Sequence, residues 1–383
     1  MQETSMRMRY RRLALAVVCA AGGSLAHADW VVAQVAPLTG ATAVQSKAYA
    51  QGMRLYFNEV NKSGGVHGDR LRLVSADDRG SPEDTVKQTQ RLLQEAKPVA
   101  LAGYFGNRNL QALLDSKLLE QASISLVGFH STDMRVLKAP QLFSTRAGLP
   151  EEVEKIAKHL ATLGLTRLAL VYDERSEDEA KALTQLVGSL VTASGGQLLA
   201  QVPWKAGKQA QEAAIDSLQR AEPRAQAVLV VASSPASAAF LEAYRLEGGA
   251  AQVYATSSAD IEQLATRLPV ELMRGVSIAQ VVPNPYRSTN RLNKELRDLL
   301  AKQPKDEALS VSYPMMEGYV NAKVLVEAMR RTQPLSSERL ADSLRSIQSL
   351  DLGGYWVTFA RGSQSGSRFV DLSIVNAQGR VTQ

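Results

Sequence analysis

Cysteine is almost absent from this 383-residue sequence, and histidine is scarce. The one cysteine, Cys19, lies in an apolar stretch near the N-terminus, so the rest of the chain has no thiol nucleophile and forms no disulfide. His27 lies close to the same stretch. His67, His130 and His159 are far apart in sequence and do not form the i, i+4 pair that is typical of helical zinc sites. We therefore expect no metal site.

The short motifs of many enzymes are also missing. The sequence contains no G-x-S-x-G elbow, no Walker A sequence and no G-x-G-x-x-G fingerprint. Asp77 and Asp78 end a predicted strand and could form a catalytic carboxylate pair, but adjacent residues at a strand end usually point apart and cap a turn. We expect neither an enzyme nor a bound cofactor.

Positive charge is concentrated only at the N-terminus. The net charge is +6, but four arginines lie between positions 7 and 12, where only Glu3 opposes them. Without residues 1–28 the chain has 40 Lys and Arg against 37 Asp and Glu, a net charge of +3. No remaining segment concentrates basic residues with aromatics, so we expect no nucleic-acid partner.

The first 28 residues have the three parts of a secretory signal peptide. A basic start precedes an apolar run at 13–21, which is short for a membrane span. The sequence Ala26-His-Ala28 provides an A-x-A cleavage site, and cleavage after Ala28 would leave Asp29 as the first residue. Two alternatives remain open: lipid attachment at Cys19, which the preceding Ala-Val-Val fits poorly, and twin-arginine export through Arg11-Arg12.

Apolar runs of strand length alternate with stretches of helical spacing along the rest of the chain. We predict strands at 30–36, 71–75, 99–102, 123–128, 168–172, 197–202, 227–232, 252–255 and 276–282, with helices between most of them. Helices at about 288–302, 313–331 and 336–346 follow, and 354–359 with 369–375 is predicted to be a β-hairpin. The alternation predicts an α/β protein with two doubly wound parallel sheets.

Residues 98–114 contain a strand, a glycine-containing loop at 103–107 and the start of a helix. Ligands of open α/β sheets bind at the carboxyl ends of strands. The first N–H groups of the next helix have no partner inside the helix and carry partial positive charge, so a carboxylate or phosphate could bind there. The alternative is an ordinary strand-to-helix turn.

Five segments resemble periplasmic solute-binding proteins of the leucine/isoleucine/valine-binding type, which serve ABC importers. They are VVAQVAPLTG (31–40), NEVNKSGGVHG (58–68), LVSADD (73–78), EGYVNAKVLVEAM (317–329) and GSRFVDL (366–372). The segments follow the family's order. The resemblance implies two lobes joined by three crossovers near Ala147, Gln280 and Gly353. Lobe 1 would comprise residues 29–147 and 281–352, and lobe 2 would comprise 148–280 and 353–383.

The resemblance also implies where a ligand binds. In the family, lobe 1 holds the ligand carboxylate at loops that match Gly103–Asn107 and Phe129–Ser131. Asn107 and Ser131 fall where the family usually has hydroxyl-bearing residues, and both can donate hydrogen bonds. The aromatics Tyr104, Phe105 and Phe129, together with Gly106 and His130, lie near the expected cleft, where they could form an apolar wall or pack under the loop.

At four positions the sequence departs from the family's pattern. Gln45, Glu177 and Ser233 stand where aromatics are frequent, and Ser257 stands where an acid often pairs with the ligand's ammonium. Because Ser257 offers no negative charge, we favour a ligand without an ammonium group. The alternative is that Glu177 replaces the missing acid, although an acid at a helix start also suits the helix dipole.

Together these features predict a secreted, periplasmic and monomeric receptor. It would bind a small polar or carboxylate-bearing solute between two lobes and deliver it to the permease subunits of an ABC-type importer. The alternatives are an amino-acid or amide binder with Glu177 as the ammonium partner, the ligand-sensing lobe of a signalling system, and an enzyme on a doubly wound fold.

Overall fold

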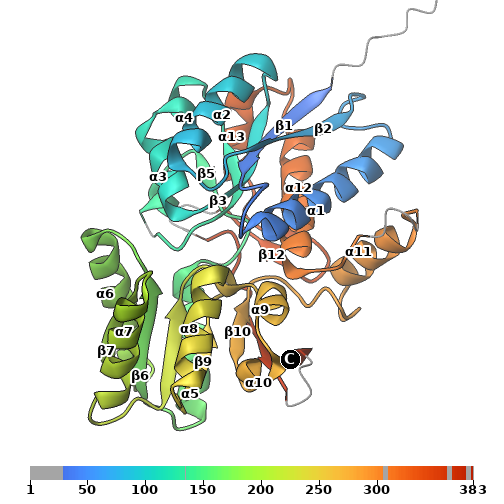
Figure 1. The fold of residues 1–383 in the computed structure, drawn as a ribbon. Helices are drawn as coiled ribbons and strands as arrows, with labels where there is room; N and C mark the ends of the chain where they lie inside the picture. Colours follow the sequence, from blue (N-terminus) through green and yellow to red (C-terminus); the bar gives the residue numbers. More distant parts are fainter. Residues whose placement is uncertain (1–28, 134, 305–308, 360–364, 377–380, 383) are drawn as a thin grey trace, which may run out of the picture.

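Two mainly parallel sheets organise the computed structural model, which describes residues 29–133, 135–304, 309–359, 365–376 and 381–382 (Figure 1). In the first sheet, neighbouring strands are parallel and lie in the order β2-β1-β3-β4-β5. The bounds are β1 (Trp30–Ala36), β2 (Leu71–Asp77), β3 (Ala100–Phe105), β4 (Leu126–His130) and β5 (Leu142–Phe143).

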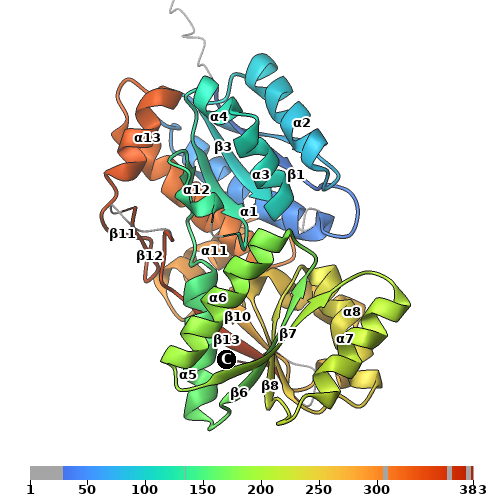
Figure 2. The ribbon, with the colours of Figure 1, turned by 90° about the vertical axis from the view of Figure 1, so that its left-hand side faces the viewer.

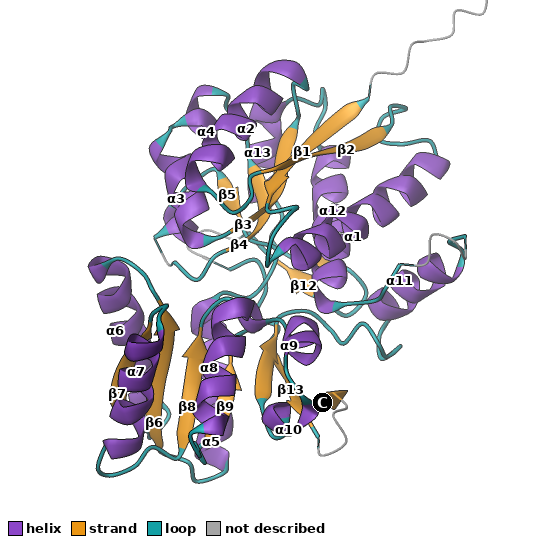
Figure 3. Ribbon diagram, in the orientation of Figure 1, coloured by secondary structure: helices purple, strands orange, loops and turns teal. Residues whose placement is uncertain are grey.

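Helices cover both faces of the first sheet, as Figure 3 shows. On one face lie α1 (Ala43–Lys62) and α12 (Tyr313–Arg331), and α13 (Ser337–Arg345) packs against α12. On the other face lie α2 (Pro82–Glu95), α3 (Asn107–Asp115) and α4 (Leu118–Gln121). In β1, Val32 packs with the α1 side, and Ala33 and Val35 pack with the α3 side. This two-sided burial explains why the strand is apolar throughout and does not alternate.

Helices α1 and α12 cross at two glycines. A Cβ atom at Gly52 would lie 2.0 Å from the carbonyl oxygen of Met315, and one at Gly318 would lie 1.9 Å from that of Tyr49. Any side chain at these positions would force the two backbones apart. The glycine at 318, inside the segment 317–329, therefore has a packing role.

The second sheet has the order β14-β13-β10-β9-β8-β6-β7. Its parallel strands are β6 (Arg167–Asp173), β7 (Gln197–Trp204), β8 (Ala227–Val231), β9 (Gln252–Ala255) and β10 (Ser277–Gln280), and β13 (Asp371–Val375) and β14 (Val381–Thr382) add antiparallel strands at one edge. Figure 2 shows α5 (Leu149–Thr162) and α6 (Glu177–Ala193) on one face and α7 (Lys208–Arg220) and α8 (Ser234–Leu246) on the other. The prediction of an α/β protein with two doubly wound lobes is confirmed.

Short elements complete the described chain. They are the 3-10 turns η1 (Val136–Lys138) and η2 (Ser257–Ala259), the helices α9 (Ile261–Arg267), α10 (Val270–Met273) and α11 (Arg291–Ala301), and the strands β11 (Leu350–Asp351) and β12 (Trp356–Val357). None of the helices in the described ranges is long and apolar enough to cross a membrane. The predicted signal peptide, with Cys19 and the cleavage site at Ala28, lies outside the described residues.

The chain passes between the two sheets three times: from β5 to α5, from β10 toward α11 and α12, and from β12 to β13. Tyr355 joins these passages, because its hydroxyl lies 3.0 Å from the carbonyl oxygen of Thr145 and 3.1 Å from that of Val281. The lobe boundaries at 147/148, 280/281 and 352/353 stay a prediction.

The predicted hairpin of 354–359 with 369–375 is wrong. β12 pairs antiparallel with β11, whereas β13 pairs with β10 of the second sheet. The two segments lie on either side of the third passage between the sheets, and Tyr355 holds the first of them there. β13 instead extends the second sheet, where Leu372 and Val375 are buried. The sequence could not separate the two segments, because β12 pairs with β11 directly before it, whereas the partner of β13 is β10, far away in the chain.

Candidate functional site

A cavity of about 350 Å³ lies between the two lobes. Residues at or after the carboxyl ends of β1, β2, β3 and β4 line it from lobe 1, and residues at or after those of β6, β8 and β9 line it from lobe 2. This is the place where open parallel sheets bind ligands. Apart from Phe105, His130, Pro37 and Ala232, the lining is largely polar or charged.

Seven of the eleven predicted site residues line this cavity: Gln45, Phe105, Gly106, Asn107, His130, Ser131 and Ser233. The other four do not. Tyr104 and Phe129 are buried in the lobe 1 core, Glu177 is exposed at the start of α6, and Ser257 is bound to a glutamate behind the cavity wall. Whether the lining residues bind a ligand stays a prediction.

The turn from β3 to α3 leaves the start of the helix open toward the cavity. Gly106 precedes the helix with φ +100°, a conformation that favours glycine, and provides no side-chain cap. The first turn of α3 contains no acid and instead carries the exposed Arg108. The partial positive charge of the helix N-terminus therefore has no acidic counterpart in that turn.

Asn107 is held by the loop that follows β4. Its Oδ1 accepts hydrogen bonds from Ser131 Oγ at 3.0 Å and from the backbone N–H of Thr132 at 2.9 Å, and its Nδ2 donates to Thr132 Oγ1 at 3.0 Å. The proton of Ser131 is therefore already used. Thr132 Oγ1 is the acceptor in its hydrogen bond with Asn107, so its own hydroxyl proton is available to another acceptor. Sequence reasoning did not identify Thr132, although it follows Ser131 directly.

The aromatic part of the wall is a stack of Phe105 and His130, with ring centroids 4.2 Å apart and planes at 14°. Tyr49 meets both rings edge-on, at 5.6 Å and 5.7 Å. Phe105 and His130 end adjacent strands, where they are paired in register. The apolar wall expected from the sequence thus consists of these two rings, and Tyr104 and Phe129 pack on the other side of the sheet.

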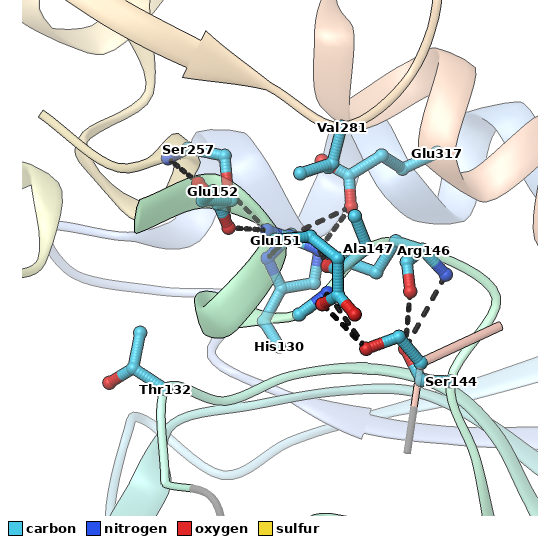
Figure 4. A network of polar contacts seen from close by, with 12 residues as sticks. His130, Thr132, Ser144, Arg146, Ala147, Glu151, Glu152, Ser257, Val281 and Glu317 are labelled. Carbon is cyan, nitrogen blue, oxygen red and sulfur yellow. Dashed lines mark hydrogen bonds and ion pairs between the residues drawn. The ribbon is translucent and has the colours of Figure 1, made fainter. Parts of the chain in front are cut away.

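A buried network of charged groups lies behind His130, as Figure 4 shows. Arg146, in the first passage between the lobes, donates through Nη1 to Glu317 Oε2 of α12 and through Nη2 to Glu152 Oε1 of α5, both at 3.1 Å. His130 Nε2 lies 2.9 Å from Glu317 Oε2. Arg146 thus connects a carboxylate of one lobe to a carboxylate of the other.

The same network binds Ser257. Glu152 accepts from the backbone N–H of Ser257 at 2.6 Å and from its Oγ at 2.9 Å, and Arg146 Nη2 also contacts that Oγ. Ser257, a predicted ligand-binding residue at the position where the family often has an acid, therefore binds Glu152, which lies 105 positions earlier in the sequence. No local pattern could have identified this partner.

Burial and charge act in opposite directions inside the network. Burial lowers the pKa of His130 below its ordinary value, so the imidazole is neutral at pH 7. Burial also raises the pKa of Glu152. For Glu317, burial is the largest single effect and would raise the pKa, but the charge of Arg146, the charge interaction with His130 and the hydrogen bonds from both residues together lower it. The Arg146–Glu317 pair is thus the ionised centre of the network.

The corresponding turn of lobe 2, from β6 to α6, is capped internally. Ser176 Oγ accepts from the backbone N–H of Glu179 at 3.3 Å, and Glu179 Oε2 accepts from that of Ser176 at 2.9 Å, which forms a capping box. Glu179 Oε1 also pairs at 2.9 Å with Arg135 of lobe 1. Glu177, in the first turn of α6, points its charge to solvent and does not line the cavity.

Residues 173–175 of this turn do line the cavity. Arg175 Nη2 donates to Asp173 Oδ1 at 2.7 Å, and Asp173 Oδ2 accepts from the backbone N–H of Ser233 at 3.0 Å. Glu174 is exposed and makes no hydrogen bond or ion pair within the described residues. Sequence reasoning considered Glu174 only as part of an acidic helix start and did not identify Arg175.

Asp77 and Asp78 both cap turns, each through its own set of hydrogen bonds. Asp77 accepts from the backbone of Leu38 and Arg79, and Asp78 accepts from the backbone of Gly80 and the side chain of Thr85. Within the described residues, no group of three or more His, Cys, Asp or Glu side chains is placed to hold a metal ion.

Comparison with known proteins identifies the family. The model of the periplasmic binding protein family matches residues 30–377. A crystal structure of a substrate-binding periplasmic protein from Ralstonia solanacearum superposes with a TM-score of 0.82 and 32% identity, covering 92% of this chain and 99% of that one.

Curated relatives match over shorter segments. An amino acid binding protein of Pseudomonas aeruginosa is 33% identical over 125 residues, or 32% of this chain and 33% of that protein. A Leu/Ile/Val-binding protein of Rhizobium johnstonii is 36% identical over 69 residues, or 18% of this chain and 19% of that protein. The matches thus span a third or less of these relatives. The family model nevertheless covers nearly all of the described residues, and the chain belongs to the periplasmic binding protein family, with similarity to its leucine/isoleucine/valine-binding members.

Proposed function

We propose that this protein is a secreted, monomeric solute receptor that binds a small carboxylate-bearing molecule between its lobes and delivers it to the permease of an ABC-type importer. The observation that carries the proposal is the cavity between the lobes, onto which the uncapped N-terminus of α3 opens. Its lobe 1 lining contains Arg108 and no carboxylate. An anionic group of the solute is therefore expected on the lobe 1 side.

Export is part of the proposal. Residues 1–28 carry the basic, apolar and A-x-A parts of a signal peptide, and the family is periplasmic. Edman sequencing of protein from the periplasm should begin Asp29-Trp-Val. Protein that stays in the cytoplasm with Met1 intact contradicts export.

A thermal-shift screen tests the receptor function. Amino acids, amides, aliphatic acids and aromatic acids are each added to the purified protein, and a ligand that binds the folded state raises Tm by mass action. Small-angle scattering with the best carboxylate should then show a smaller radius of gyration, because closing the lobes completes the site. An unchanged radius at saturation contradicts the two-lobe clamp, and the absence of any stabilising acid contradicts a carboxylate receptor.

A second candidate is an amino-acid receptor, and Glu174 favours it. Glu174 is a carboxylate of the cavity wall without a partner among the described residues, so it could pair with an ammonium group. Glu174 would then have the role of ammonium partner that the sequence analysis considers for Glu177. The names of the curated relatives agree with an amino-acid ligand. Glu174→Gln should then abolish binding of an amino acid but leave binding of a simple carboxylate nearly unchanged, as measured by titration calorimetry.

A further inference from the structure

Arg175 is a nearly buried cation of lobe 2 with spare hydrogen-bonding capacity. Its side chain is only 4% exposed, yet the residue lines the cavity. Nη2 makes the 2.7 Å bond to Asp173 Oδ1, and its other contacts, to the carbonyl of Val231 at 3.3 Å and to Thr132 Oγ1 at 3.5 Å, are long. Nε donates to the carbonyl of Asp173 at 3.4 Å, and the guanidinium carbon lies 5.9 Å from the centre of the Tyr172 ring. Nη1 makes no hydrogen bond within the described residues. A guanidinium can donate five hydrogen bonds, so this one is only partly satisfied.

Thr132 places Arg175 beside the anion-binding side of lobe 1. Thr132 belongs to lobe 1, and its Oγ1 also accepts the 3.0 Å bond from Asn107 Nδ2. Donors from both lobes therefore converge on one hydroxyl oxygen in the cavity wall. A ligand oxygen that accepts the Thr132 proton in front of the α3 N-terminus would lie close to Arg175.

The lobe 2 carboxylates in the described cavity lining are already paired or exposed to solvent. Asp173 is already shared by Arg175 and the backbone of Ser233, and Glu179 is shared by Arg135 and the backbone of Ser176. Glu174 is exposed. An anion at the α3 N-terminus would therefore meet Arg175 as the cationic side chain that lobe 2 contributes to the described cavity lining.

We propose that Arg175 binds, from lobe 2, the same anionic group of the solute that lobe 1 binds at the start of α3. This rests on the receptor function proposed above and names its ligand class: the solute must carry a negative charge at this end, and its uncharged amide is a poor ligand. The anion bridges the lobes, so its charge contributes directly to closure. Charge-assisted bonds from a planar guanidinium to a carboxylate are strong and geometrically selective.

Matched acids and amides test this class. The pairs are leucine and leucinamide, isovalerate and isovaleramide, benzoate and benzamide, and glutarate and glutaramide. Each compound is titrated into wild-type protein and into the Arg175→Gln, Arg175→Lys and Arg135→Gln variants. Arg135→Gln is the matched control, because Arg135 also pairs across the lobes, at 2.9 Å with Glu179, but does not line the cavity.

We expect the best acid to bind wild-type protein at least about 10-fold more tightly than its amide. Arg175→Gln should weaken the acid on the order of 10- to 100-fold and the amide little, so that the acid-to-amide ratio approaches one. Arg175→Lys should recover part of that ratio. Arg135→Gln should change acid and amide by the same factor and leave the ratio unchanged. The acid should decrease the radius of gyration of wild-type protein, and this decrease should not occur in Arg175→Gln.

The contrary outcomes separate this inference from the receptor function. An acid that binds wild-type protein and Arg175→Gln equally, or an amide that binds wild-type protein as well as its acid, overturns the role of Arg175 and leaves the receptor function standing. If no acid of the set binds wild-type protein, the role of Arg175 and the function as a carboxylate receptor are both contradicted. If Arg175→Gln does not fold, by circular dichroism without ligand, the double variant Asp173→Asn/Arg175→Gln replaces it, because it removes the ion pair as a neutral unit.

Discussion

Each lobe presents a strand-to-helix turn to the cavity, and the N-termini of the two helices are capped differently. At the start of α3 in lobe 1, Gly106 gives no side-chain cap and the first turn has no acid. At the start of α6 in lobe 2, a capping box of Ser176 and Glu179 satisfies the end of the helix, and three acids follow in the first turn. A helix end that is satisfied internally adds to stability, whereas an open one is available to a ligand. We therefore assign stability to the start of α6 and anion binding to the start of α3, with Arg175 before α6 as the proposed contribution of the second turn to recognition.

A negative charge placed at the open start of α3 should have the largest effect on ligand affinity. Asn107→Asp keeps the oxygen that accepts from Ser131 and Thr132 but adds a negative charge in the first turn of α3. Like charges placed together cost several kcal/mol, so binding of the best carboxylate should weaken on the order of 100-fold or more. Asn107→Ala, which only removes hydrogen bonds, should cost about 1–3 kcal/mol. Titration calorimetry measures both. Equal affinities of wild-type protein and Asn107→Asp would show that the acid does not bind at this turn.

The lobe 1 turn should also be the acid-sensitive one, because His130 stacks on Phe105 beside it. Burial holds the pKa of folded His130 below the value of 6.5 expected in the unfolded chain. As the pH falls below about 6.5, the unfolded chain gains a proton that the folded chain does not bind, so the free energy of unfolding falls, by at most about 1.4 kcal/mol per pH unit.

Thermal melts of His130→Gln from pH 7.5 to 5 isolate this contribution. The variant should lose less stability on acidification than wild-type protein. His67→Gln is the control, because His67 is exposed and does not line the cavity. Parallel pH curves for wild-type protein and His130→Gln would rule out His130 as the source of the acid sensitivity.

How much of these two turns the sequence predicts depends on the range of the interactions. The strands, the helices and the glycine loop at 103–107 follow from local periodicity and composition, and so does the acidic start of α6. The partners of Arg146 do not, because Glu317 lies 171 positions away and Ser257 lies 111 positions away. Glu174 and Glu177 could not be ranked either. Ser176 caps the helix, so residue 174 stays on the cavity side and residue 177 turns to solvent.

The capping box of α6 can be weakened at Ser176, which does not line the cavity, although its partner Glu179 does. Ser176→Ala removes the oxygen that accepts from the backbone of Glu179, which should cost about 1 kcal/mol of stability. The affinity for the best acid should stay within about twofold, because Ser176 does not line the cavity. Urea denaturation followed by circular dichroism measures the loss, and Ser176→Thr, which keeps a capping oxygen, should recover most of it. A loss of affinity as large as that of Asn107→Asp would contradict the division between the two turns.

The smallest effect is expected at Glu177, where the two interpretations of the sequence diverge. Glu177 lies in the first turn of α6, is exposed and does not line the cavity. Its carboxylate therefore acts on the helix dipole from solvent, a contribution of about 0.3–1 kcal/mol that salt screens. Glu177→Gln should lower stability by no more than this, the loss should shrink in 1 M NaCl, and ligand affinity should be unchanged. If Glu177 instead binds a ligand ammonium, the substitution abolishes amino-acid binding and leaves the melting temperature of the free protein nearly unchanged. Titration of Glu177→Gln beside Glu174→Gln with the same amino acid decides between them, because the structure places only residue 174 in the cavity wall.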